Sequence, residues 1–238
     1  MRALLVIATA AALASAAGCA GRVEDKATAE STAPPRDDPA PAADFKELPE
    51  PSREGGLPLA EVLAARRSTR TYGSRKLTDA EVGQLLWAGQ GITSDRGYRA
   101  APSAGALYPM TLYYADDVAL WRYEPKDHGL TKVVEGDVRG DVAAAALGQA
   151  PLKRASGIII VIAKPSISAA KYRERAERYC MLEAGHIGQN ILLTAEALGL
   201  GACPMGAFRD EEVLDVVELG DDYLPLYLIP VGERFVSK

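Results

Sequence analysis

Residues 157–163 read Gly-Ile-Ile-Ile-Val-Ile-Ala, and this unbroken apolar run, rich in β-branched side chains, decides the fold class. A run of this length without alternation indicates a strand that is covered on both faces. The surrounding chain lacks the regular alternation of strands and helices that is typical of a doubly wound dinucleotide-binding fold. We therefore predict an α+β fold, with residues 157–163 at the centre of the sheet.

The other elements are predicted from shorter patterns. Thr78 and Glu81 form a capping box at the start of a helix. Ser168 opens a long helix whose apolar stripe, Cys180 to Leu198, predicts that much of its second half is buried. We expect helices over residues 58–67, 78–89, 168–198 and 211–218, a meander of strands over 111–115, 118–123 and 130–134, and a last strand over 226–231.

Composition bounds the class of protein. The chain has 238 residues, 48% hydrophobic and 25% charged, which is ordinary for a globular head. Its formal net charge of −5 argues against nucleic acid as a partner, because phosphate backbones require a large basic face. Three cysteines and two histidines match no metal-ligand spacing, so we expect no metal site.

The first 18 residues are typical of a secretory signal peptide. A positive start is followed by an apolar run over residues 3–14, which is shorter than the roughly 20 residues that span a bilayer. The sequence 16–19, Ala-Ala-Gly-Cys, is similar to a bacterial lipoprotein box and would place a lipid anchor on Cys19. Ordinary cleavage after Ala16 is the alternative. Both readings predict export, to the periplasm or the cell envelope.

Residues 19–57 are rich in Ala and Pro and poor in large apolar side chains, so we expect a disordered tether there. The folded head is expected over residues 58–238. Within it, Cys180 and Cys203 could pair in an oxidising compartment, and the sequence leaves this open.

A cation cluster marks the start of the head. Residues 66–76 contain five cations and no acid. The forks of Arg66, Arg67 and Arg70 together with the hydroxyl of Ser68 suit a terminal phosphate, because bidentate charge-assisted bonds fix its orientation. The alternative is a solvated helix end.

Two loops of small residues offer a backbone that a flat ligand can approach. They contain Pro102, Ser103 and Gly105 in one case and Pro204, Met205 and Gly206 in the other. The two histidines offer no base for a Ser–His–Asp hydrolase. We expect His186 to be a hydrogen-bonded core residue and His128 to be solvated.

Taken in order, the segments Arg-Arg-Ser-Thr-Arg (66–70), Pro-Ser-Ala-Gly-Ala-Leu-Tyr-Pro (102–109) and Glu-Ala-Gly-His-Ile-Gly-Gln-Asn (183–190), with Gly-Leu-Gly (199–201) before Pro204, resemble the nitroreductase superfamily. The SagB-type dehydrogenases are the most similar branch, and the resemblance runs from about Pro58 to Arg234. It implies an FMN-dependent α+β fold with a mostly antiparallel sheet flanked by helices, and a homodimer with FMN at the interface.

The resemblance also assigns site residues. Arg66, Arg67, Ser68 and Arg70 match the segment that holds the FMN phosphate and ribityl chain. Arg234, with Lys238 a weaker candidate, would add a C-terminal cation at the phosphate. The remaining residues are Pro102, Ser103 and Gly105, which match a loop along the flavin ring that the other subunit usually contributes, and Pro204, Met205 and Gly206, which match the segment whose backbone N–H faces flavin N5.

Lys171 and Tyr172 resemble the pair that serves as catalytic base in branch members that oxidise azoline rings. The alternative is that Lys171 belongs to a charged turn that faces water. We therefore expect an exported FMN oxidoreductase that transfers hydride at N5 and takes a small-molecule or peptide substrate. A non-catalytic flavin-binding lipoprotein and an azoline oxidase acting on modified peptides are the alternatives.

Overall fold

The computed structural model describes residues 44–54 and 56–235, and the predicted signal peptide, Cys19, most of the tether and Lys238 lie outside them. The elements are β1 (Phe45–Glu47), α1 (Leu59–Ala65), α2 (Asp79–Gln90), η1 (Ala104–Ala106), β2 (Met110–Ala115), β3 (Ala119–Glu124), β4 (Gly129–Glu135), α3 (Arg139–Ala145), α4 (Ala150–Arg154), β5 (Gly157–Ala163), α5 (Pro165–Tyr172), η2 (Arg173–Arg175), α6 (Ala176–Ala197), β6 (Leu200–Ala202), α7 (Asp210–Val217) and β7 (Leu224–Glu233).

A seven-stranded sheet with the order β1-β4-β3-β2-β5-β7-β6 forms the middle layer, and all of its strand pairs are antiparallel. Every residue of β5 is buried, and the strand lies between β2 and β7. The neighbouring strands β2, β3 and β4 form the predicted meander. The α+β class and the interior position of residues 157–163 are therefore confirmed.

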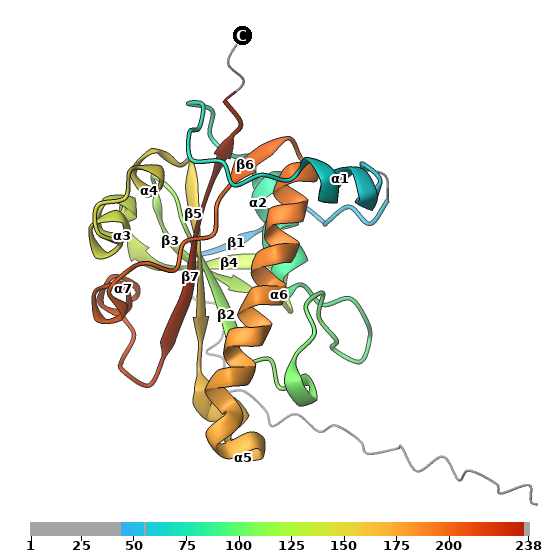
Figure 1. The fold of residues 1–238 in the computed structure, drawn as a ribbon, viewed down its shortest axis with the longest axis vertical. Coiled ribbons are helices and arrows are strands. Elements are labelled where there is room, and N and C mark those ends of the chain that lie inside the picture. Colours follow the sequence, from blue (N-terminus) through green and yellow to red (C-terminus); the bar gives the residue numbers. More distant parts are fainter. Residues whose placement is uncertain (1–43, 55, 236–238) are drawn as a thin grey trace, which may run out of the picture. The chain divides into compact units, whose positions relative to one another are not determined.

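Helices cover both faces of this sheet (Figure 1). Ile159 and Val161 of β5 pack on one face in a hydrophobic cluster with residues of α2 and α6. Ile158 and Ile160 point to the other face, in a cluster with residues of α3, α4 and α7. The alternation of side chains along a strand thus explains why a continuous apolar run was required.

Helix α2 begins where the sequence predicts. Thr78 accepts a hydrogen bond from the Glu81 backbone, and the Glu81 side chain accepts one from the Thr78 backbone, 2.8 Å away. At the other end, a Cβ on Gly89 would lie only 2.9 Å from Leu112 Cδ1 and 3.2 Å from Ile191 Cδ1. Gly89 therefore lets α2 approach α6 and the sheet closely.

The long helix expected over residues 168–198 is not continuous. Pro165 occupies the first turn of α5, so helix begins earlier than Ser168. At Arg173 the backbone turns to φ 50°, and η2 separates α5 from the 22-residue α6. The expected stripe is buried from Cys180 to Ala195. Leu198 is 39% exposed, because the helix has ended at Ala197.

The ordered head begins before Pro58. Phe45–Glu47 adds strand β1 to the edge of the sheet beside β4, and Leu48 is 4% exposed in the core. His128 fastens this segment, since one ring nitrogen lies 2.9 Å from the Pro49 carbonyl and the other 2.9 Å from the Tyr123 hydroxyl. The expectation for the two histidines was therefore wrong: His128 is half-buried and hydrogen-bonded, whereas His186 is exposed on α6.

Cys180 and Cys203 are both free and buried. They belong to clusters on opposite faces of the sheet, so they do not pair. Of the helices in the described ranges, none combines the length and apolar character needed to cross a membrane.

Candidate functional site

The segment that contains the predicted phosphate ligands lies along the β6–β7 edge of the sheet. Ser68 pairs with Ala202 in a parallel bridge, and the Thr69 N–H donates to the Ala202 carbonyl over 2.9 Å. Further on, Tyr72 forms an antiparallel bridge with Arg234 at the end of β7. The segment of residues 66–70 is thus held against strands of the sheet.

Ion pairing divides the five cations of residues 66–76. Arg75 pairs with Glu81 at 2.8 Å, and Lys76 pairs with Asp117. Within the described residues, no carboxylate forms an ion pair with Arg66, Arg67 or Arg70. Positive charge left without a carboxylate partner suits an anionic ligand. The candidate phosphate ligands are therefore Arg66, Arg67, Arg70 and Ser68, and Ser68 is exposed.

The loop of Pro204, Met205 and Gly206 follows β6 directly and so lies beside this segment. Met205 is buried, and its N–H is donated to the Leu228 carbonyl over 2.9 Å. Gly206 is exposed, and a Cβ built on it would have no neighbour within 4 Å. Of the two backbone N–H groups that the resemblance singles out, Gly206 is the one that a ligand can reach. We call Arg66, Arg67, Ser68 and Arg70 together with Pro204, Met205 and Gly206 the cradle.

The second predicted loop is held in an unusual backbone conformation. Gly105, Ala106 and Tyr108 have φ angles of 63°, 53° and 51°, which side chains with a Cβ seldom adopt. The Ser103 hydroxyl accepts the Tyr108 N–H over 2.9 Å and closes the loop. Strain of this kind at two non-glycine residues, Ala106 and Tyr108, beside an exposed glycine is typical of a functional site.

Lys171 and Tyr172 lie directly against this loop. A Cβ on Gly105 would lie 2.8 Å from the Tyr172 hydroxyl and 3.0 Å from Lys171 Nζ. The Tyr172 ring packs edge-on against Tyr179, with centroids 4.8 Å apart. The structure thus brings together two predicted features that are more than sixty residues apart in the sequence. We call Pro102, Ser103 and Gly105 with Lys171 and Tyr172 the wall.

Within one chain the cradle and the wall lie at opposite ends of α6 (Figure 1). Tyr172 precedes α6 by way of η2, whereas β6 follows its last turn. Twenty-two helical residues span about 33 Å. Between the two ends, Met181 and Leu182 are 55% and 53% exposed on the helix. One chain therefore holds the two groups of candidate residues apart, at opposite ends of this helix.

Arg234 lies at the cradle end of the molecule, but its guanidinium is already engaged. Nη1 donates to Glu196 Oε1 over 3.0 Å, Nη2 donates to Glu196 Oε2, and Nη2 also donates to the Leu200 carbonyl over 3.2 Å. Glu196, which is buried, is a residue that the sequence analysis missed. No sequence motif marks it, because its partner is 38 positions away.

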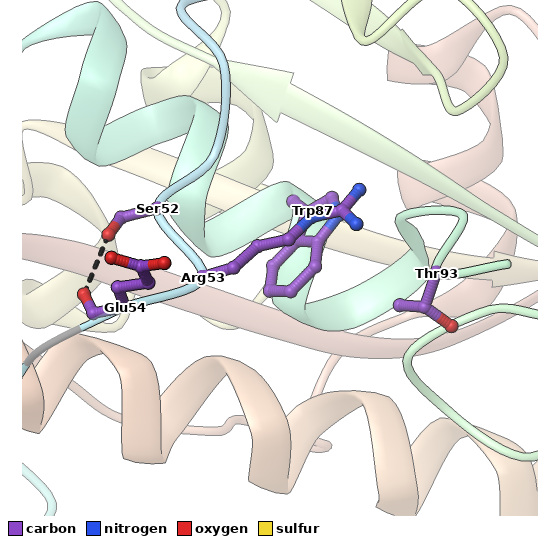
Figure 2. A pocket seen from close by; sticks show the side chains of 5 residues that line it. All are labelled: Ser52, Arg53, Glu54, Trp87 and Thr93. Atoms are coloured by element: carbon purple, nitrogen blue, oxygen red, sulfur yellow. Dashed lines mark hydrogen bonds between the residues drawn. The ribbon is translucent and has the colours of Figure 1, made fainter.

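A hollow of about 350 Å³ lies elsewhere, beside the end of α2. Figure 2 shows the Arg53 side chain extending to the Trp87 indole, and Arg53 Cζ is 5.9 Å from the ring centroid. Ser52, Glu54 and Thr93 complete its lining. None of these residues belongs to the cradle or the wall, so the hollow is separate from the predicted site.

Comparison with known proteins defines the family. The model of the Nitroreductase family matches residues 63–233, and the chain therefore belongs to the nitroreductase family. A protein of Methanocaldococcus jannaschii whose name assigns it to the nitroreductases is 36% identical over 184 residues, which cover 75% of this chain and 92% of that protein.

Solved structures agree with this assignment. A crystal structure of a protein from Ralstonia eutropha JMP134, also named a nitroreductase, superposes with a TM-score of 0.75 at 27% identity, covering 81% of this chain and 90% of that one. The NADPH:FMN oxidoreductase of Vibrio harveyi, solved with NAD+, shares the fold with a TM-score of 0.56 at 19% identity, covering 75% and 69% of the two chains. Nitroreductases are oxidoreductases that generally use a flavin and are usually homodimers.

The residues present fit a phosphorylated flavin. Arg66, Arg67 and Arg70 are not ion-paired with any described carboxylate. Nη1 of Arg67 donates to the Ala64 and Arg66 carbonyls over 2.9 and 2.8 Å, which leaves Arg66, Arg70 and the rest of the Arg67 guanidinium for a phosphate. Gly105 and Gly206 expose backbone that a planar ring could approach, and Gly206 has open space where a side chain would project. Among the described residues, no group of three or more His, Cys, Asp or Glu side chains is arranged to hold a metal ion.

Proposed function

We propose that this protein is an FMN-dependent oxidoreductase of the SagB-type branch of the nitroreductases. The observation that carries the proposal is the cradle, where three arginines without ion-pair partners lie beside an approachable backbone N–H. Arg66, Arg67 and Arg70 would bind the terminal phosphate through charge-assisted hydrogen bonds, and Ser68 would donate to it. Riboflavin has no phosphate and would not form these hydrogen bonds.

FMN would supply the redox chemistry by accepting and returning hydride at N5. The chain's contribution there is a fixed hydrogen-bond donor. Because Met205 is committed to Leu228, we assign that role to the Gly206 N–H. A backbone donor on a strand-anchored loop needs no rearrangement during the reaction, and that is the source of its catalytic value.

A homodimer would complete the site. Cradle and wall are separated by the length of α6, so two copies packed in opposite directions along this helix would bring the wall of one chain to the cradle of the other. The exposed Met181 and Leu182 provide apolar surface for that contact. Each dimer would then contain two equivalent sites.

The wall supports a second candidate function, the oxidation of an azoline ring in a modified peptide. Such a reaction removes a proton from carbon together with a hydride, so it needs a base beside the flavin. Lys171 and Tyr172 lie against Gly105, at the surface that would face the ring. Replacing Lys171 with Ala would abolish this activity and leave FMN bound. Retained activity in the variant would exclude Lys171 as the base.

Export to the cell envelope, by the predicted signal peptide and with Cys19 as lipid anchor, is part of the proposal. Cytoplasmic nicotinamide pools are not accessible there. A quinol, an exported redox partner or a peptide is therefore as suitable an electron donor as NAD(P)H.

The test is an anaerobic titration of the purified chain loaded with FMN. A visible flavin spectrum that bleaches with NADH, NADPH or a quinol, and returns with an acceptor, is the expected result. A colourless protein that takes up no added FMN would refute the proposal. Tightly held FMN that no donor reduces would instead favour a non-catalytic flavin-binding protein.

A further inference from the structure

We propose that Arg234 is a positioning residue rather than a phosphate ligand, and that together with Glu196 and Tyr72 it fixes the shape of the cradle. The proposal rests on the proposed function in one respect, namely that residues 66–70 hold the FMN phosphate. It assigns roles to two residues, Tyr72 and Glu196, that no sequence motif singles out.

The hydrogen bonds that Arg234 already makes leave few of its N–H groups for an external anion. Its guanidinium forms a two-pronged contact with the Glu196 carboxylate, and Nη2 gives its second hydrogen to the Leu200 carbonyl. The Nε atom is buried without a partner among the described residues. The Glu196 side chain is only 7% exposed, so its negative charge offsets that of the guanidinium at short range. A dianion would gain little from approaching this pair.

What the pair does instead is join three elements. Glu196 lies in the last turn of α6, Leu200 opens β6, and Arg234 follows β7. A bidentate Arg–carboxylate contact has a defined geometry. The Glu196 carboxylate is buried, so removing its partner would leave a buried charge uncompensated. The contact therefore holds the end of β7 in register against α6 and β6.

Tyr72 links the end of β7 to the cradle. It pairs with Arg234 in an antiparallel bridge, and the next residue, Gly73, donates its N–H to the Glu233 carbonyl over 2.9 Å. The Tyr72 hydroxyl lies 2.7 Å from the Thr69 carbonyl and 3.2 Å from the Pro230 carbonyl, and the two carbonyls share its single proton. Burial raises the pKa of Tyr72, so the hydroxyl keeps its proton.

Two glycines show how closely this segment is seated. A Cβ on Gly201 would lie 2.6 Å from Thr69 Cγ2, and one on Gly232 would lie 3.0 Å from Tyr72 Cβ. The side chains of Thr69 and Tyr72 are therefore packed directly on β6 and β7. A shift of the β7 end would move Thr69, and with it the flanking Ser68 and Arg70.

The experiment compares the dissociation constants of FMN and riboflavin, measured by quenching of flavin fluorescence. Riboflavin lacks the phosphate, so the ratio of the two constants isolates the cradle from the rest of the site. Tyr72→Phe removes one oxygen, and Glu196→Gln keeps the shape of the side chain. We expect each to weaken FMN binding about 5- to 10-fold, as the loss of one hydrogen bond to a positioned group does, and to leave riboflavin binding unchanged.

A matched control is the exposed ion pair between Arg209, which precedes α7, and Glu212 in its first turn, with an N–O distance of 2.9 Å. Glu212→Gln should leave both constants unchanged. A second measurement needs no flavin. Amide hydrogen exchange at Thr69 should become faster in Tyr72→Phe, because the hydrogen bond from the Tyr72 hydroxyl to the Thr69 carbonyl is then absent. It remains informative if a variant binds too weakly to titrate.

The outcomes separate the two proposals. If Arg234 contacts the phosphate directly, Glu196→Gln will release a competing carboxylate and strengthen FMN binding, and Tyr72→Phe will leave the FMN-to-riboflavin ratio unchanged. Either result overturns the positioning role while the proposed function stands. A wild-type chain with no preference for FMN over riboflavin would overturn the proposed function and this inference with it.

Discussion

Replacing Gly105 with Ala tests whether the wall is built from the close approach of its two segments. The φ angle of Gly105 is 63°, where a Cβ costs about 1–2 kcal/mol. The added carbon would also lie 2.8 Å from the Tyr172 hydroxyl and 3.0 Å from Lys171 Nζ. Both atoms end flexible side chains, so they would move aside rather than break the fold. We expect the loss of stability to come only from the strained backbone at residue 105. The displacement of Lys171 and Tyr172 should instead lower the catalytic activity.

Gly97→Ala is the matched control. Its φ angle is 76°, and no heavy atom lies within 4 Å of a Cβ built there. With a slope of about 2 kcal/mol per M, both variants should lower the urea midpoint by about 0.5–1 M. Flavin turnover should fall about 10-fold or more in Gly105→Ala, because a displacement of about 1 Å in a reacting group has effects of that size. Gly97→Ala should retain wild-type turnover.

Two results would refute this reasoning. Equal turnover in the two variants would show that Lys171 and Tyr172 have no role that depends on their contact with Gly105. An unchanged urea midpoint in Gly105→Ala would show that the left-handed backbone is not required there.

Three further predictions concern the scaffold, each measured by urea unfolding. Thr78→Ala should lower the free energy of unfolding by about 1 kcal/mol through loss of the capping box, and no loss would mean that the cap is not formed in solution. Gly89→Ala should lower it by about 1–3 kcal/mol, since the new methyl group meets Leu112 of β2 and Ile191 of α6, and a stabilised variant would contradict that packing. Hydrogen bonds from Arg75 hold the pKa of the Glu81 carboxyl below its ordinary value, so their stabilisation is complete above the ordinary pKa and is lost as the pH falls through the lowered one. Arg75→Gln should therefore be less stable than wild type at neutral pH, and the difference should shrink as the pH falls through the lowered pKa of Glu81. A difference that does not change with pH would contradict the assignment.

The elements that could be predicted are those set by local rules. The buried run at residues 157–163, the capping box of Thr78 and the meander all depend on periodicity or on neighbours in the sequence. The break at Arg173 was missed because no Gly or Pro marks it. Strands β1 and β6 were missed because each has three residues, too few to show alternation, and depends on pairing with distant strands.

The candidate site likewise has features that local sequence predicts and features that depend on the tertiary fold. The arginines of the cradle could be found from composition, because five cations without an acid are unusual in an acidic chain. Which of them are available could not be predicted, since the partners of Arg75 and Arg234 come from α2 and α6. The contact of Lys171 and Tyr172 with Gly105 likewise depends on the tertiary fold.

The central claim is that each active site is assembled from two chains, and co-purified heterodimers test it most directly. One chain would carry Arg66→Ala with Arg70→Ala in the cradle, and the other Gly105→Phe in the wall, each with its own affinity tag. Both homodimers should be inactive with FMN. The heterodimer retains one unaltered cradle facing one unaltered wall, so it should recover about half of the wild-type turnover. A heterodimer as inactive as its parents would place each site within a single chain and contradict the account.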